Sequence, residues 1–268
     1  MAGLLSLVEL PRSTFYRQTK SLQKPDKHAQ LKELVNQVYH EQKGLYGYRR
    51  VALVIQSRGM LVNKKMVERL MAEQGLKSVV RPKKYRSYRG TVGKIAMNLL
   101  DRNFVAQRPN QKWVTDVTEF KVAQQKFYLS PVMDLYNGEI VAYETASRPS
   151  YDLVGNMLDK ALDCLGEEPK LVIHSDQGWQ YQQAKYRHKL KQRGVKQSMS
   201  RKGNCLDNAA MESFFGTLKS EFFYLRQFES IEELKSDLDE YIRYYNHDRI
   251  KLRLNGLSPV DYRTQAAG

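Results

Sequence analysis

The stretch KWVTDVTEFKV, residues 112–122, decides the fold class of this chain. Its apolar and polar residues alternate, which is the pattern of a β-strand with one buried face. Two further strand-like stretches follow, KFYLSPVMDL at 126–135 and EIVAYETAS at 139–147. The dipeptide Asn137-Gly138 between them is typical of a tight hairpin. The sequence therefore predicts three antiparallel strands in succession.

Helices and short strands alternate after this hairpin. Residues 151–166 repeat apolar side chains at helical spacing, and the apolar run at 171–173 indicates a short buried strand. We expect further helices at 183–193 and 207–221, separated by a strand at 195–198. The resulting order, β-β-β-α-β-α-β-α, is that of an α/β domain with five strands.

The C-terminal region is expected to be helical. Ser230 and Glu233 have the spacing of a capping box, in which two side chains satisfy backbone N–H groups at the start of a helix. We expect a last helix that runs from this point to about Tyr245.

Residues 28–75 have the pattern of a compact helical unit, and a shorter helical segment precedes it. Asn63 is placed to cap the last helix of this unit and Gly75 to end it. Three short helices with a basic last one fit a DNA-binding module, whereas the alternative is a plain three-helix bundle with a solvated polar face. The basic residues of that last helix are Lys64, Lys65 and Arg69.

The net charge of +15 is confined to one part of the chain. Residues 1–110 contain 22 Lys and Arg against 7 Asp and Glu, whereas residues 111–268 contain 22 of each kind. This segregation indicates a basic arm that binds nucleic acid, and a solubilising charged surface is the alternative. The segment 77–100 has seven basic residues and no acidic one. Among them, the residues that we expect to contact phosphates are Arg81, Lys83 and Lys84.

Cysteine usage and hydropathy exclude other classes of protein. Cys164 and Cys205 form no CxxC pair and no Cys/His cluster, so we expect no zinc site. No apolar run approaches the roughly 20 residues of a membrane span. The N-terminus has neither the basic region nor the cleavage site of a signal peptide. We therefore expect a cytoplasmic protein without a membrane partner.

Three acidic residues stand in distinctive settings: Asp116 in WVTDVTEF, Asp176 in LVIHSDQGWQY and Glu212 in DNAAMESFFGTLKSE. Carboxylates from two strands and a helix can meet and hold two hard divalent cations, an arrangement that suits phosphoryl transfer on a nucleic-acid strand. Lys219 follows Glu212 by seven residues, close to two helical turns, so both side chains lie on one face. A cation there can hold a phosphate.

Each acid also has an ordinary structural interpretation. A strand aspartate can cap a turn, and a helix glutamate usually faces solvent. The competing carboxylates are Glu119, Asp134 and Asp207. Asp134 precedes the hairpin and fits a turn residue, while Asp207 fits a cap for the helix that carries Glu212.

The stretch between Asp176 and Glu212 is strongly basic. From residue 177 to residue 206 it has eight Lys and Arg residues and no acidic residue. Its SRKGN loop, which contains Arg201 and Lys202, would suit a DNA strand that enters a metal site. A basic exposed helix is the alternative.

These motifs, with 35 residues between Asp176 and Glu212, resemble the DDE transposases of bacterial insertion sequences. The resemblance is to the second-reading-frame (OrfB-type) subunit of insertion-sequence family three, close to retroviral integrases. YGYRRV at 46–51 and VNKKMVERLM at 62–71 are similar to its small helical domain. YYNHDRIKLRLNGLSPVDY at 244–262 is similar to its C-terminal signature.

The resemblance implies a ribonuclease-H-like core with a mixed five-stranded sheet, after a small all-α DNA-binding region. It implies Asp116, Asp176 and Glu212 as catalytic ligands of two Mg²⁺ or Mn²⁺ ions, and Lys219 as a contact to DNA. The implied partners are double-stranded DNA (terminal inverted repeats and target), further copies of the chain on that DNA, and the upstream-frame product or its fusion. A nucleoid-associated bacterial protein is expected.

We expect five regions along the chain. They are an N-terminal helical segment (1–27), the helical DNA-binding domain (28–76), a basic linker (77–110), the integrase-like core (111–225), and a C-terminal helix with its tail (226–268). Two other functions remain open at this point. One is a metal nuclease of the ribonuclease H class that cuts without joining, and the other is a DNA-binding regulator or assembly subunit whose acidic site is idle.

Overall fold

The computed structural model describes residues 11–22, 26–80, 96–101, 103–165, 170–201 and 208–267. The chain forms two compact units, residues 1–79 and 80–268, which are treated separately below. Some residues singled out above lie outside the described residues: Arg81, Lys83, Lys84, Lys202, Cys205 and Asp207. No helix in the described part of the chain is long and apolar enough to cross a membrane.

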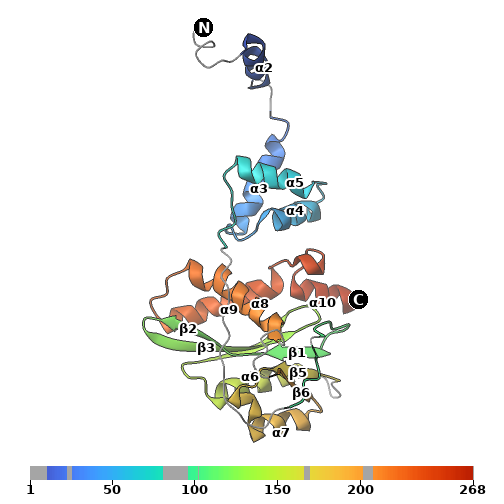
Figure 1. Ribbon diagram of the computed structural model, residues 1–268, viewed down its shortest axis with the longest axis vertical. Helices are drawn as coiled ribbons and strands as arrows, with labels where there is room; N and C mark the ends of the chain where they lie inside the picture. Colours follow the sequence, from blue (N-terminus) through green and yellow to red (C-terminus); the bar gives the residue numbers. More distant parts are fainter. Residues whose placement is uncertain are drawn as a thin grey trace. The chain divides into compact units, whose positions relative to one another are not determined.

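The smaller unit is helical, as the sequence predicts (Figure 1). The Asn63 side chain accepts a hydrogen bond from the Lys65 backbone N–H at 2.9 Å, so the predicted cap of the last helix is confirmed. Buried valine, leucine and isoleucine side chains hold three of the helices together. The helices are α2 (Arg12–Leu22), α3 (Ala29–Glu41), α4 (Tyr48–Ser57) and α5 (Lys64–Glu73).

The described strands of the larger unit form one mixed, six-stranded sheet. Its order is β2-β3-β1-β5-β6, and β4 pairs with β3. The pairs made by β3 are antiparallel, whereas β1–β5 and β5–β6 are parallel. The strands are β1 (Lys112–Thr115), β2 (Thr118–Val122), β3 (Gln125–Asp134), β4 (Ile140–Ala146), β5 (Val172–Ser175) and β6 (Lys196–Met199).

The predicted mixed sheet is confirmed, but its first strand is divided in two. β1 and β2 pair with the same long strand β3 in one continuous register, since Thr115 faces Val132 and Thr118 faces Leu129. The residues between β1 and β2 therefore interrupt the hydrogen bonds to β3, but they leave the register of the pairing unchanged. The count of five strands was wrong for this reason.

Pro131 explains the interruption. The common register places Pro131 of β3 opposite Asp116. The Leu135 N–H donates to the Lys112 carbonyl of β1 at 2.9 Å. Every second N–H group of a strand points to the same neighbouring strand, so the backbone nitrogen of residue 131 also points toward the chain of β1 and β2. Proline has no N–H to donate, and the ladder breaks where Asp116 lies.

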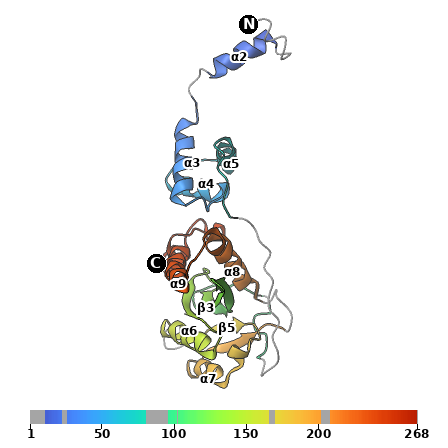
Figure 2. The same cartoon turned by 90° about the vertical axis from the view of Figure 1, so that its left-hand side faces the viewer.

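Helices cover both faces of the sheet (Figures 1 and 2). One face packs against α8 (Ala209–Glu221) and α9 (Ile231–His247), and its core contains Val114, Phe120 and Phe214. The opposite face packs against α6 (Tyr151–Asp163) and α7 (Ala184–Gln192). The outcome is a three-layer α/β domain, as expected from the order of elements.

The start of α9 confirms half of the predicted capping box. The Ser230 hydroxyl accepts a hydrogen bond from the Glu233 N–H at 3.1 Å. The Glu233 carboxylate, however, accepts from the Glu229 N–H at 2.8 Å, one residue before the cap.

α9 is not the last helix, so that prediction was wrong. A further helix, α10 (Pro259–Ala267), follows it. The Ser258 hydroxyl accepts a hydrogen bond from the Asp261 N–H, and proline occupies the first helical position. Serine followed by proline, with an acid three residues after the serine, is a helix-start signal that was present in the sequence.

Part of the segment expected to be a linker packs on the larger unit. The Met199 N–H donates to the Met97 carbonyl, and the Leu99 N–H donates to the Ser198 hydroxyl. Leu100 is buried in the core beneath α8 and α9. Residues 96–100 therefore lie along β6.

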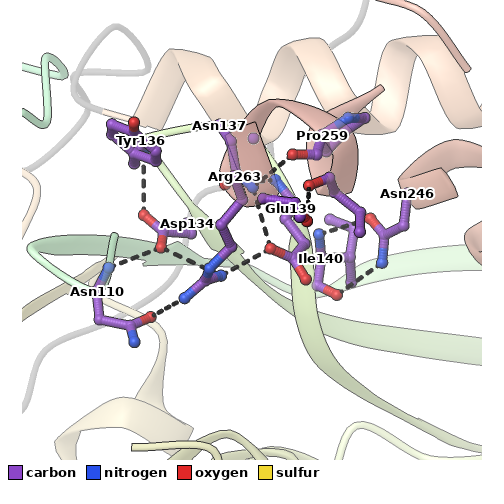
Figure 3. Close-up of polar contacts among 12 residues, drawn as sticks. Asn110, Asp134, Tyr136, Asn137, Glu139, Ile140, Asn246, Pro259 and Arg263 are labelled. Atoms are coloured by element: carbon purple, nitrogen blue, oxygen red, sulfur yellow. Dashed lines mark hydrogen bonds and ion pairs between the residues drawn. The ribbon is translucent and has the colours of Figure 1, made fainter. Parts of the chain in front are cut away.

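The β3–β4 hairpin is a docking point for the C-terminal helices (Figure 3). Asp134 is fully buried and accepts hydrogen bonds from the backbone N–H groups of Asn110 and Tyr136, at 2.8 and 3.0 Å. From α10, the Arg263 guanidinium donates to Glu139 at 2.7 Å and lies 3.8 Å from Asp134. The predicted hairpin is therefore confirmed, and its turn binds α10.

A second set of contacts fixes the same hairpin to both helices. The Asn246 side chain of α9 accepts from the Ile140 N–H and donates to the Ile140 carbonyl, each at 2.9 Å. The Asn137 amide donates to the Pro259 carbonyl at 2.9 Å. Gly138 adopts φ +74°, a backbone conformation that favours glycine and that the Asn-Gly signal anticipates.

We predict that Arg263→Ala lowers the free energy of unfolding by about 1–3 kcal/mol, because it leaves buried polar groups of the hairpin without a partner. The matched control is Lys126→Ala, which removes a half-exposed ion pair with Glu119 and should cost less than about 1 kcal/mol. Urea unfolding of the full chain measures both. Equal losses in the two variants would contradict the docking role of Arg263.

Candidate active site

Asp116 and Asp176 lie at the carboxyl ends of neighbouring parallel strands. The β1–β5 register pairs Val114 with His174, so each aspartate lies two residues beyond this pair. Asp116 was expected inside the first strand, but it follows β1 directly, at the break opposite Pro131. Strand ends of this kind commonly carry the functional residues of α/β domains.

The electrostatics show that the acidic side chains are close enough to affect one another. The pKa of Asp116 is raised well above its usual value, first by burial and then by the negative charge of Asp176, with a further contribution from Glu212. Lys219 opposes this rise in the same pKa. The charges of Asp176, Glu212 and Lys219 are thus near enough to Asp116 to act on its pKa.

Asp176 and Glu212 share the same physical environment. Burial raises the pKa of the Asp176 carboxyl, and a hydrogen bond from the Gly178 N–H at 2.9 Å opposes the rise. Burial also raises the pKa of Glu212. All three carboxylates nevertheless remain partly exposed, so a solute can reach them.

Glu212 and Lys219 are carried by α8, in its first and last turns. The Asn208 amide, just before α8, donates to the Thr115 carbonyl at 3.4 Å and so links this helix to the end of β1. The Lys219 ammonium lies 5.4 Å from the centre of the Phe120 ring, and burial lowers its pKa. Glu212 raises the pKa of Asp116 and Lys219 lowers it, so both side chains act on the same carboxyl, in agreement with the shared helix face predicted for them.

The donor chemistry of the site fits a hard divalent cation. The three predicted ligands supply only carboxylate oxygens, which such ions prefer. Their mutual repulsion, seen in the raised pKa of Asp116, is what a cation would remove. The Asn208 side-chain oxygen is buried without a hydrogen-bond partner beside the end of β1. Within the described residues, no three His, Cys, Asp or Glu side chains are close enough together to hold a metal.

Gly178 lets the backbone approach the Asp176 carboxylate. A Cβ atom at this position would lie 2.9 Å from Asp176 Oδ1 and 3.1 Å from the Gln180 side-chain oxygen. Any larger residue must therefore displace the carboxylate. The sequence analysis missed this residue, although an Asp-x-Gly spacing after a buried strand was there to suggest it.

A buried ion pair fixes the far end of α8. The Arg249 guanidinium donates two hydrogen bonds to the Glu221 carboxylate, both at 2.6 Å, and the two side chains are only 7% and 5% exposed. The Tyr241 hydroxyl also donates to Glu221, at 3.3 Å. On the same helix, Phe214 packs edge-on against Tyr245, with ring centres 4.9 Å apart.

Lys251 extends this arrangement to the β3–β4 hairpin. Its ammonium donates to the Gly138 carbonyl at 2.8 Å and to the Tyr245 hydroxyl at 2.9 Å. The C-terminal signature, 244–262, therefore supplies two buried cations that hold α8 and the hairpin in place. The sequence analysis quoted this stretch but assigned no role to Arg249 or Lys251.

The competing carboxylates have structural partners. Glu119 accepts hydrogen bonds from Lys126 and Tyr128, at 3.0 and 2.8 Å. Asp134 belongs to the hairpin network of Figure 3. Glu119 is also near enough to Lys219 for that charge to lower its pKa, after the larger effects of Lys126 and Tyr128.

The predicted DNA-binding side chains of the smaller unit are exposed on α5. Lys64 and Lys65 occupy its first turn, and Arg69 forms a 3.5 Å ion pair with Glu73. Two more arginines lie in the first turn of α4. Arg49 donates to the Tyr48 hydroxyl at 3.2 Å, and the Arg50 guanidinium lies 5.2 Å from the centre of the Tyr46 ring.

In the larger unit, Arg201 forms a 3.5 Å ion pair with Asp101, and both side chains are exposed. The pair joins the segment that follows β6 to the segment that precedes β1. Exposed ion pairs are weak, so Arg201 could exchange Asp101 for a phosphate at little cost.

Three family matches account for most of the chain. The family described as "Integrase core domain" matches residues 106–205, and a second family with the same description matches residues 212–266. The family described as "HTH-like domain" matches residues 26–84. The fold and its paired carboxylates thus define a polynucleotidyl transferase core of the integrase type. Such cores depend on divalent metal ions.

Curated relatives extend over nearly the whole chain. It is 55% identical to the putative transposase InsK for insertion sequence element IS150 of Escherichia coli, over 98% of this chain and 93% of that protein. It is 39% identical to the probable transposase for IS1353 of Shigella flexneri, over 98% and 52% respectively. It is 33% identical to transposase InsF for insertion sequence IS3A of E. coli, over 82% and 77%. The chain belongs to the insertion-sequence transposases of family three.

We predict that Arg249→Ala lowers the free energy of unfolding by about 3–5 kcal/mol, because the Glu221 charge is then buried without a partner. The double variant Glu221→Leu/Arg249→Met should recover most of this loss, since apolar residues of similar volume often replace a buried pair without penalty. Denaturant unfolding of the two variants beside the parent chain measures both values. A small loss in Arg249→Ala would show that this pair does not hold α8.

Proposed function

We propose that this transposase cuts DNA at the ends of an insertion sequence and joins them to target DNA, with Asp116, Asp176 and Glu212 as the catalytic residues. The observation that carries the proposal is geometric: Asp116 and Asp176 follow neighbouring parallel strands in register, and Glu212 lies in the first turn of α8, which Asn208 links to the end of β1. The pKa of Asp116, raised first by burial and then by repulsion from Asp176 and Glu212, agrees with this arrangement. A protein gains no stability from such repulsion, and perturbed carboxylates of this kind are typical of functional sites.

The three carboxylates would hold two Mg²⁺ or Mn²⁺ ions. Bound there, the ions would activate a water or a DNA 3′-hydroxyl and stabilise the leaving 3′-oxygen. Asp116 and Asp176 contribute from fixed strand ends, and Glu212 contributes from α8. Lys219, on the same helix face as Glu212, would hold a phosphate of the bound strand.

DNA binding is proposed to extend over both units. The substrate would be double-stranded DNA, as terminal inverted repeats and as target. The helical unit would contribute Lys64, Lys65 and Arg69, the segment after it Arg81, Lys83 and Lys84, and the loop before α8 Arg201 and Lys202. The match to an HTH-like domain over 26–84 supports the first two groups. Their phosphate contacts would concentrate the protein at the nucleoid.

The assembly is also proposed. Joining two element ends to one target calls for more than one copy of the catalytic core, so we expect a homo-oligomer on DNA. The IS1353 relative supports a partnership with an upstream-frame product or a fusion to it, because this chain covers only 52% of that longer protein. The five regions expected above, with boundaries at 27, 76, 110 and 225, remain part of this proposal.

We predict that Asp116→Asn, Asp176→Asn and Glu212→Gln each abolish Mg²⁺-dependent nicking and joining of an element end, while folding and DNA binding persist. These amides keep the shape of the side chain but remove the charge that binds the cation. The control is Asp159→Asn. Asp159 lies on α6, and its substitution removes an exposed ion pair with Lys189 of α7. Substantial activity in any folded triad variant would remove that residue from the site.

We also predict that Gly178→Ala lowers the rate of nicking by about 10- to 100-fold, because the new Cβ displaces the Asp176 carboxylate without changing its charge. Gly47→Ala, whose Cβ meets no atom within 4 Å and whose φ is negative like that of Gly178, controls for the backbone effect of the substitution. Melting curves separate lost stability from lost activity. An unchanged rate in Gly178→Ala would show that the position of Asp176 is not critical.

A further inference from the structure

The short helix η1 (Trp179–Gln182) inverts the usual order of burial. Trp179 is 50% exposed, whereas Gln180 and Gln182 are only 7% and 9% exposed. Buried polar residues and an exposed large aromatic residue are both informative departures from the normal pattern. Two glutamine side chains of this helix are therefore buried, while the Trp179 indole is in contact with solvent.

A frame of side-chain amides fixes this helix. Gln180 donates to the Pro149 carbonyl at 3.1 Å, and Gln182 donates to the Gln177 carbonyl at 2.6 Å. From β6, Gln197 donates to the Tyr181 carbonyl at 2.8 Å. Tyr181 itself is buried at the core of the domain. The indole is thus presented from a rigid base rather than from a mobile loop.

The same segment is tied to the proposed metal ligand. The Gly178 N–H donates to Asp176 Oδ1, and η1 begins with the next residue. Because Gly178 leaves no room for a side chain, the path from Asp176 to Trp179 is short and fixed. The indole is therefore carried three residues after Asp176, on backbone that is hydrogen-bonded to that carboxylate.

The chemistry of an exposed indole selects its ligand. Its flat face stacks on other π systems, and every nucleobase has such a face. A nucleotide whose phosphate lies at the carboxylates carries a base within a few ångströms of that phosphate. Stacking of this kind tolerates any base sequence, so the contact adds affinity without specifying a sequence.

We propose that Trp179 binds DNA by stacking its indole on a nucleobase next to the phosphate bound at the proposed metal site of Asp116 and Asp176. This contact rests on the proposed function, because it needs a DNA strand at the carboxylates. The base can come from the element end or from target DNA, since the stacking chemistry is the same.

The chain contains two tryptophans, which makes the contact visible by fluorescence. Trp113 is fully buried and is therefore an internal reference, whereas Trp179 is exposed. The full chain is titrated in the presence of Ca²⁺, a hard divalent cation that can bridge the carboxylates and a phosphate. It is titrated with an element-end duplex and, separately, with a duplex of unrelated sequence, while fluorescence anisotropy of the labelled DNA reports binding. Stacking should quench the emission of Trp179 on binding, and Trp179→Phe should lose this quenching.

Trp179→Ala should weaken binding of the quenching duplex by roughly 10-fold, and Trp179→Phe should restore most of the affinity because it keeps an aromatic face. Quenching by one duplex alone identifies the source of the base, and quenching by both supports the shared contact. Binding without quenching, or equal affinity of the alanine variant, overturns the stacking proposal and leaves the cleavage chemistry intact. Failure to bind either duplex contradicts the proposed function as well.

Discussion

The parallel pairing of β1 with β5 is the constraint on which the larger unit depends. Among the described strands it is the seam between the antiparallel part of the sheet and the parallel part. The same seam ends at Asp116 and Asp176, so the fold cannot form without bringing two negative charges together. The repulsion opposes folding, while the burial of Val114 and Trp113 in the two cores favours it. Such a conflict between local cost and global fold is typical of a functional site.

The third carboxylate comes from outside the sheet and needs its own support. α8 is held at its beginning by the Asn208 amide and at its end by the buried pair of Glu221 and Arg249. Its position therefore depends on residues that lie after the helix in the sequence. A buried ion pair adds little net stability but tolerates few other arrangements, which suits a helix whose orientation matters more than its stability.

Much of this fold could be predicted from periodicity. The alternation of 112–122 correctly places Val114 and Phe120 on one face, where both join the core under α8. The division of that strand could not be predicted, because the role of Pro131 depends on its partner across the sheet. α10 could have been predicted from its start signal at Ser258 and Pro259. The Glu221–Arg249 pair could not, because no local pattern joins two charges 28 residues apart in sequence.

The way residues 97–99 border β6 matters for the solution behaviour of the larger unit. A bare outermost strand offers unpaired backbone groups to any other extended chain, and proteins avoid this by covering such strands. Here Met97 and Leu99 provide part of the cover. A fragment that began at residue 111, the boundary suggested by the change in sequence pattern, would lack it. Such a fragment would aggregate through β6, whereas one that began before residue 96 would stay monodisperse.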